Sequence, residues 1–189
     1  VFSCMVRIIA ECAQGYLRDD KDQSIELAKW LVKGAKSSGA DCVKFQLVFA
    51  DELFTPDYKY YELSKKLEIG FNGWFEVYEE AKRQDIELIF DVFGHKSLSF
   101  AEELNVEEIK LHPTDFRNEE LLNAVFNSKT IKKIIAGCGG SYYKEIKNTL
   151  SFLGDKKKIT LLHGFQGYPT PVEENCLNRL EVLKLIASE

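Results

Sequence analysis

The sequence has few of the residues that cross-link a fold or bind a structural metal. It contains five cysteines, an odd number, and none of them forms a C-x-x-C pair. A disulfide framework and a zinc site are therefore not predicted, and a reducing, cytoplasmic setting is expected. Cys4, Cys12 and Cys42 lie in apolar runs, where free cysteine behaves as a small buried hydrophobic residue.

An excess of positive charge is also missing. Lys and Arg total 25 against 30 Asp and Glu, so the net charge is −5. Because no basic stripe is available to neutralise phosphates, a nucleic-acid partner is not expected. The lysines at positions 156, 157 and 158 are interpreted as a solvated turn before a strand.

Long hydrophobic runs are absent as well. The N-terminal apolar stretch is short and holds Arg7 and Glu11, so neither a signal peptide nor a membrane span is predicted. The chain starts at Val1 rather than Met, and a trimmed N-terminus is expected.

What the sequence does contain is a regular alternation of short apolar runs and amphipathic segments. The predicted strands cover residues 6–12, 41–46, 86–93, 108–112, 131–136 and 158–163. Strands this apolar are typical of a parallel sheet that is buried on both faces. The helices after the first, second and fifth strands are predicted to be capped by Asp22 or Ser24, by Asn72 and by Ser141. A last helix is predicted over 172–187, with Leu177, Leu180, Leu183 and Ala187 on one face.

Polar side chains recur where the predicted strands end: Glu11, Lys44, Gln46, Asp91, Lys110, His112, Asp115, His163 and Gln166. In a β/α barrel the C-terminal ends of the strands carry the catalytic groups. A doubly wound sheet would be expected to show one dominant Gly-rich loop after its first strand. The spread of polar groups favours a TIM-type barrel, formed by residues 1–189 as one domain. Six β/α units are two short of eight, so truncation after the sixth helix is expected.

The stretch from Ile159 to Pro171 is the most distinctive in the chain. A short strand reaches His163 and breaks into a Gly-containing loop that two prolines close. A histidine at such a strand end is either a site residue or a buried polar residue.

Four segments together resemble the sialic acid synthase family, which includes the N-acetylneuraminate, legionaminate and pseudaminate synthases. They are Ile8-Ile-Ala-Glu11, Gly39-Ala-Asp-Cys-Val-Lys-Phe-Gln46, Ile109-Lys-Leu111, and Leu161-Leu-His163 with Tyr168-Pro-Thr-Pro171. The resemblance runs from about Arg7 to Leu180. It implies a (β/α)8 barrel that condenses phosphoenolpyruvate with an N-acylated hexosamine and releases phosphate with the help of Mn²⁺ or Mg²⁺. Members of the family form dimers, so the resemblance is also compatible with a homo-oligomer.

The resemblance assigns roles to the residues at the strand ends. Glu11 and Asp115 would be catalytic, and His163 would be one of two histidines that bind the metal. The substrate-binding residues would be Lys44, Gln46, Asp91, Lys110, Gln166 and Tyr168. Lys44 and Lys110 would supply positive charge to phosphoenolpyruvate.

The chain departs from the family pattern after its third strand. Asp91 stands where the family has a hydroxyl that faces phosphate, and an acid there would repel phosphoenolpyruvate. The second metal histidine of the family follows a seventh strand, which the chain lacks. A divergent barrel lyase or aldolase and a non-catalytic binding module therefore stay open as alternatives.

Each group of candidate residues also has a purely structural interpretation. Lys44 and Lys110 lie inside apolar strands, where a salt bridge with Glu11 or Asp91 is the structural alternative. The glycines at 137, 139 and 140 either cradle a phosphate or form a turn. The aromatic residues Tyr58, Tyr60, Tyr61, Trp74 and Phe75 are interpreted as packing or as a protein interface rather than a sugar platform.

Overall fold

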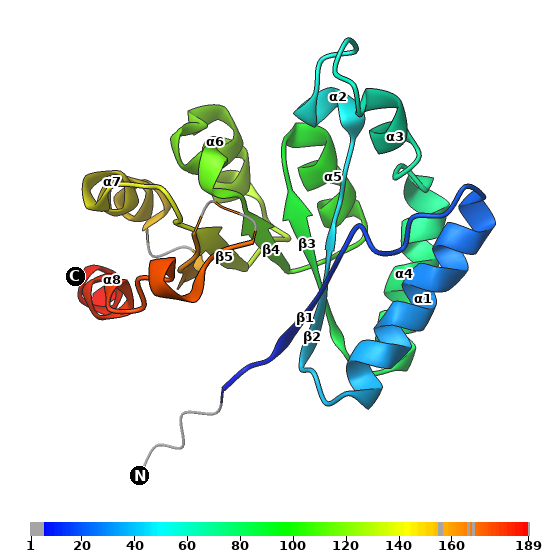
Figure 1. The fold of residues 1–189 in the computed structure, drawn as a ribbon, viewed down its shortest axis with the longest axis horizontal. Coiled ribbons are helices and arrows are strands. Elements are labelled where there is room, and N and C mark those ends of the chain that lie inside the picture. Colours follow the sequence, from blue (N-terminus) through cyan, green and yellow to red (C-terminus); the bar gives the residue numbers. More distant parts are fainter. Residues whose placement is uncertain (1–5, 155–156, 166, 168, 189) are drawn as a thin grey trace. The chain divides into compact units, whose positions relative to one another are not determined.

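The computed structural model describes residues 6–154, 157–165, 167 and 169–188 (Figure 1). Strands and helices alternate along the chain, which divides into two compact units, Val1–Val106 and Glu107–Glu189. The strands of each unit pair in parallel. The predicted α/β class with parallel strands is therefore confirmed, while the single domain over 1–189 stays a prediction. No helix in the described part of the chain is both long enough and apolar enough to cross a membrane.

The first unit carries three parallel strands in sequence order. They are β1 (Ile9–Ala13), β2 (Cys42–Gln46) and β3 (Glu87–Val92). The helices are α1 (Lys21–Ser37), α2 (Ala50–Leu53), α3 (Tyr61–Lys65), α4 (Gly70–Arg83) and α5 (His95–Glu103). The long helices α1 and α4 lie side by side along the strands (Figure 1).

The helix starts in this unit differ from the predictions. Asp20 caps α1, and its carboxylate accepts a hydrogen bond of 2.9 Å from the Gln23 N–H, so the prediction of Asp22 or Ser24 was wrong. Ser24 is fully buried, and its hydroxyl bonds to the backbone of the preceding turn.

The prediction that Asn72 caps α4 was wrong too. This helix begins at Gly70, and Ile69 is its N-cap. Ile69 is buried, and the positive φ of Gly70 lets the chain turn into the helix directly after it. Burial of Ile69, rather than a capping side chain, sets the helix start.

An aromatic cluster forms the core of the first unit. The ring of Trp74 meets those of Tyr16, Phe45 and Phe90 edge-on, with ring centroids 5.2, 5.5 and 5.0 Å apart. Trp74 is 1% exposed, whereas Phe75 beside it in α4 is 48% exposed. Of these two neighbours, only Trp74 contributes to the core.

The second unit also carries three parallel strands in sequence order. They are β4 (Glu108–Leu111), β5 (Lys133–Gly137) and β6 (Lys158–Leu162). The helices are the 3-10 turns η1 (Pro113–Arg117) and η3 (Val172–Glu174) and the α-helices α6 (Glu119–Asn127), α7 (Tyr143–Leu153) and α8 (Arg179–Ser188). The cap predicted at Ser141 was wrong, because Tyr142 is the N-cap of α7 and its N–H donates to Glu145 at 2.8 Å.

The last helix is shorter than predicted and faces the core with different residues. A 3-10 turn at 172–174 and the positive φ of Cys176 interrupt the predicted helix, and α8 begins only at Arg179. Leu183 and Ile186 are buried, whereas Leu177 and Leu180 are exposed. The predicted apolar face is therefore confirmed only at Leu183, because the buried side of α8 carries Leu183 and Ile186 instead.

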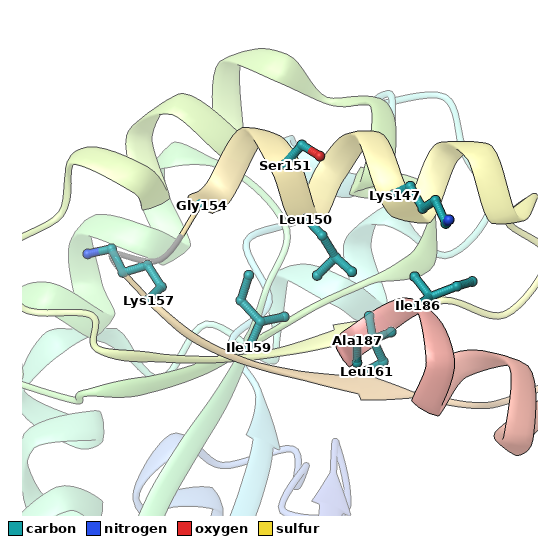
Figure 2. A pocket seen from close by; sticks show the side chains of 9 residues that line it. All are labelled: Lys147, Leu150, Ser151, Gly154, Lys157, Ile159, Leu161, Ile186 and Ala187. Carbon is teal, nitrogen blue, oxygen red and sulfur yellow. The ribbon is translucent and has the colours of Figure 1, made fainter. Parts of the chain in front are cut away.

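A cavity of about 700 Å³ lies between α7, β6 and α8 (Figure 2). Its lining is mixed: the apolar residues are Leu150, Ile159, Leu161, Ile186 and Ala187, and Lys147, Ser151, Gly154 and Lys157 complete it. None of the predicted site residues lies in this lining. It marks loose packing of α8 on β6 rather than the candidate site.

Lys157 differs from the predicted solvated turn. Its ammonium donates hydrogen bonds to the carbonyl oxygens of Ser128 and Ile131, the latter at 2.7 Å. These carbonyls lie just past the C-terminal end of α6, where a cation is favourable. Lys156 lies outside the described residues.

Candidate active site

The first candidate cluster lies on β1, β2 and β3. Strand register pairs Glu11 with Lys44 and Gln46 with Asp91. Since side chains alternate along a strand and registered neighbours share a face, these four side chains lie on one face of the first unit's strands. The sequence placed all four in the site, and the structure brings them together.

Lys44 is held between two carboxylates. Its ammonium lies 2.8 Å from the Asp91 carboxylate and also forms an ion pair with Glu11. The side chains of Lys44 and Asp91 are 6% and 1% exposed, whereas that of Glu11 is 51% exposed. The salt bridge offered as the structural alternative is therefore present, with both acids rather than one.

This charge arrangement limits the chemistry of Lys44. One ammonium and two carboxylates give the cluster a net negative charge. A lysine that acts as a Schiff-base nucleophile needs a neutral amine, which apolar or cationic surroundings favour. Lys44 instead lies between two carboxylates, so its position fits a group that orients charged partners.

The end of β1 orients Glu11. The N–H of Ala13 donates to the Glu11 carboxylate at 3.0 Å, and Ala13 adopts a positive φ where the pairing with β2 is irregular. Gln14, which sequence reasoning missed, donates to Gln46 Oε1 at 2.7 Å. Nothing in the chain pattern distinguished Gln14 from other loop residues, because its partner is 32 positions away.

Burial also controls the thiol next to this cluster. Desolvation by burial, reinforced by the negative charge of Glu11, raises the pKa of Cys12 to about 11, and Lys44 opposes the shift. Burial likewise raises the pKa of the Cys138 thiol. Cys176 is exposed.

Alkylation rates should therefore rank the thiols. Because the thiolate is the reactive form, iodoacetamide at pH 8 is expected to modify Cys176 at least tenfold faster than Cys12 or Cys138. Peptide mass spectrometry over a time course measures the rates, and the same reaction in urea serves as the control, where the rates should converge. Equal rates in the folded protein would contradict the burial of these thiols.

The second candidate cluster lies at the end of β4. Lys110 is half-buried on this strand, and Asp115 is 9% exposed in η1. The turn between them is closed by the Asp115 N–H, which donates to the His112 carbonyl at 2.9 Å. The His112 ring nitrogen Nδ1 lies 3.1 Å from the Thr114 hydroxyl. The structure therefore places Lys110, His112 and Asp115 on one continuous strand end.

His163 follows β6 directly. Its Nε2 lies 2.7 Å from the carbonyl oxygen of Asn175, so Nε2 carries the proton and donates it. Its Nδ1 is buried and has no hydrogen-bond partner within the described residues. Sequence reasoning missed Asn175, because the contact is made by its backbone. A neutral imidazole that donates one N–H to a backbone carbonyl and keeps a lone pair on the other nitrogen is the usual state of a metal ligand.

His163 therefore fits a metal ion as a single ligand. No group of three or more His, Cys, Asp or Glu side chains within the described ranges could complete such a site. The predicted site residues Gln166 and Tyr168 lie outside the described residues.

The Gly-rich stretch after β5 has a packing explanation. A Cβ at Gly137 would lie 3.0 Å from Pro113 and 3.2 Å from the Leu111 carbonyl. The Ser141 N–H donates to the Cys138 carbonyl at 3.3 Å, and Gly140 has a positive φ of 74°. Gly139 and Gly140 therefore form a turn, whereas Gly137 ends β5 against Pro113. The phosphate interpretation of these glycines stays a prediction.

Comparison with known proteins gives a consistent family. The NeuB family model matches residues 31–186 of the chain. An uncharacterized protein of Methanocaldococcus jannaschii is 34% identical over 176 residues, which cover 92% of this chain and 51% of that protein. An N,N'-diacetyllegionaminic acid synthase of Campylobacter jejuni is 29% identical over 195 residues, which cover 94% of this chain and 56% of that enzyme. The chain thus spans about half the length of these curated relatives.

The fold has a counterpart among solved structures. The N-acetylneuraminic acid (sialic acid) synthetase of Leptospira borgpetersenii, crystallised with citrate, superposes with a TM-score of 0.85 at 23% identity. The match covers 98% of this chain and 65% of that one.

Proposed function

Because the chain belongs to the NeuB family, we propose that its protein condenses phosphoenolpyruvate with an N-acylated hexosamine and releases phosphate. The family match confirms the resemblance to the sialic acid synthases. The observation that carries the proposal is the Lys44–Glu11 pair, an ammonium and a half-exposed carboxylate at registered positions of two neighbouring parallel strands. The proposal concerns the activity of the whole protein, because the chain spans about half the length of its curated relatives.

The proposal includes a (β/α)8 barrel to which this chain contributes six units. Support comes from the uneven burial of the strands in the second unit. Most of β5 is buried, whereas β6 alternates between exposed and half-buried residues, with Leu162 42% exposed. A strand of a closed barrel is covered on both faces, so β6 has room for further barrel strands beside it.

Lys44 and Lys110 would bind the carboxylate and phosphate of phosphoenolpyruvate. Asp91 is fully buried and cannot leave Lys44, whereas Glu11 is half-exposed. An incoming anion would therefore replace Glu11 on Lys44, and the released carboxylate of Glu11 would turn to the hydroxyls of the sugar. Such an exchange keeps the ammonium paired at every stage, as a buried charge requires.

The remaining residues would act on the acceptor. The Asp115 carboxylate would orient the sugar or the attacking water, and Gln46, Gln166 and Tyr168 would line the pocket. His163 would hold the divalent metal, Mn²⁺ or Mg²⁺, through Nδ1. When bound, the metal would supply Lewis-acid polarisation of the acceptor's aldehyde oxygen.

Phosphate release tests this function. The whole protein, mixed with phosphoenolpyruvate, Mn²⁺ and a panel of N-acylated hexosamines, is expected to release inorganic phosphate in an acceptor-dependent manner. His163→Ala is expected to lower the rate by about a hundredfold or more, the usual range for losing a group that acts in the transition state. His95→Ala is the matched control, because His95 is an exposed histidine at the start of α5 and has no assigned role in the site. The absence of release with every acceptor would refute the proposal.

A divergent barrel lyase or aldolase is the second candidate, and Asp91 favours it. This buried acid neutralises part of the charge that Lys44 would offer to phosphoenolpyruvate. A substrate with less negative charge than phosphoenolpyruvate would suit the cluster better. Carbonyl compounds without phosphate that bind in competition with phosphoenolpyruvate, or in its place, would support this candidate.

A further inference from the structure

The segment between β2 and α4 contains two helices that are too short to be stable on their own. α2 has four residues and α3 has five, which is far below the length at which an isolated helix is stable. Both lie beyond the C-terminal end of β2 (Figure 1). Their position must therefore come from side-chain contacts.

The two ends of this segment are anchored in the core of the first unit. Residues 47–50 are buried, as are Leu67 and Ile69. Tyr16 donates its hydroxyl to the Leu67 carbonyl at 2.9 Å, and Glu68 accepts the Ala50 N–H at 3.0 Å. The tip, residues 55–60, is exposed. Motion of the segment would therefore pivot near Ala50 and Leu67.

The two adjacent carboxylates of α2, Asp51 and Glu52, bind different neighbouring helices. Asp51 accepts from the ammonium of Lys65 at 2.8 Å and from the Tyr61 hydroxyl, which ties α3 to α2. Glu52 binds the backbone of α5 instead. Its Oε1 accepts the Lys96 N–H at 2.5 Å, and its Oε2 accepts the Ser97 N–H at 3.2 Å. Glu52 thus connects the α2–α3 pair to the helix that follows β3.

The first turn of α5 is built to receive this carboxylate. Its N-cap is Gly94, which has no side chain to satisfy the free N–H groups. A carboxylate at this end is also favoured by the helix dipole. A Cβ on Gly94 would lie only 2.5 Å from Glu52 Oε1, so the glycine makes room for Glu52. Ser97 closes the same turn from within, since its Oγ accepts the N–H groups of Phe93 and Gly94.

We propose that Glu52 is a positioning residue that latches the α2–α3 segment, residues 51–66, to the turn after β3. This turn begins two residues after Asp91, the buried partner of Lys44. The latch therefore holds the segment to the turn that directly follows the strand carrying Asp91. Breaking it would release α2 and α3 together, because Asp51 joins them. The consequence for substrate binding rests on the proposed function, but the latch itself does not.

Amide hydrogen exchange tests the latch directly. Glu52→Ala removes the carboxylate, and Gly94→Ala displaces it by a second route, at a backbone φ of −175° that alanine adopts freely. Both variants are expected to speed exchange at Lys96 and Ser97, and across peptides from 51–66, by roughly tenfold, the effect of losing a helix cap. Glu62→Ala, at an exposed glutamate of α3, is the matched control and should behave as the parent.

Two results would overturn the proposal. Faster exchange at Lys96 and Ser97 alone, with residues 51–66 at the parent rate, would make Glu52 a helix cap and nothing more. Unchanged exchange both at Lys96 and Ser97 and in residues 51–66 would show that the Glu52 contact stabilises neither region. Glu52→Gln keeps an acceptor oxygen, and its exchange should fall between the parent and Glu52→Ala.

A kinetic arm separates the latch from the proposed function. In protein that releases phosphate, Glu52→Ala and Gly94→Ala are expected to raise KM several-fold with little change in kcat, because the chemical groups stay in place. A kcat loss without a KM change would contradict the positioning role. If the parent protein releases no phosphate, the proposed function is refuted. The exchange rates then still test whether Glu52 holds residues 51–66 in place.

Discussion

Replacing Lys44 with methionine is expected to lower the free energy of unfolding by about 3–5 kcal/mol at neutral pH, the usual consequence of removing one member of a buried ion pair. Lys44→Met leaves Asp91, which is 1% exposed, beside Glu11 with no cation between them. Urea unfolding followed by tryptophan fluorescence measures the change, because both tryptophans of the chain, Trp30 and Trp74, lie in the first unit.

A surface ion pair provides the matched control for Lys44. Lys66 lies 3.0 Å from Asp19, and both side chains are largely solvated, so Lys66→Met is expected to change the unfolding free energy by less than about 1 kcal/mol. Adding Asp91→Leu to Lys44→Met should recover part of the loss, because an apolar pair needs no charge compensation. Equal losses for Lys44→Met and Lys66→Met would contradict a buried cluster.

The second large effect is expected at Trp74. Trp74→Ala should lower the free energy of unfolding by about 3–5 kcal/mol, the range for deleting a large aromatic side chain from a core. The loss includes the edge-on contacts with Tyr16, Phe45 and Phe90 as well as the cavity left behind. Far-UV circular dichroism in a urea titration is the suitable measurement, since the variant removes the buried fluorophore.

Phe75→Ala is the control for Trp74, because the two residues are neighbours in the same helix. Phe75 is 48% exposed, and its replacement is expected to change stability by about 0.5 kcal/mol or less, as is usual at the surface. A loss at Phe75 as large as that at Trp74 would mean that this face of α4 is covered in the protein, as an interface would require.

Much of the candidate site could be predicted from the order of residues. Apolar runs indicated all six strands, and their polar ends indicated Glu11, Lys44 and Asp91. Period-two alternation on parallel strands puts residues in register, and those two apart, on the same face; the register itself came from the structure. A salt bridge of Lys44 with Glu11 or Asp91 was the structural alternative, suggested by the high free energy of an unpaired buried ammonium, and the structure contains both ion pairs.

Other features could not be predicted, because they depend on contacts between distant segments. Glu52 caps a helix 44 residues away, and Asn175 holds His163 through a backbone carbonyl. The start of α8 also escaped prediction, since the positive φ of Cys176 has no counterpart in residue type.

The sequence by itself determined the family, the α/β alternation and the identity of the polar strand ends, because these depend on residue type and local spacing. The tertiary structure decided how the charges are shared. Only the packed strands show that Lys44 faces two carboxylates, one buried and one half-exposed. The reason is physical: residue type fixes which groups can ionise, whereas burial and proximity, set by the packing of distant strands, determine which charges remain available to a substrate.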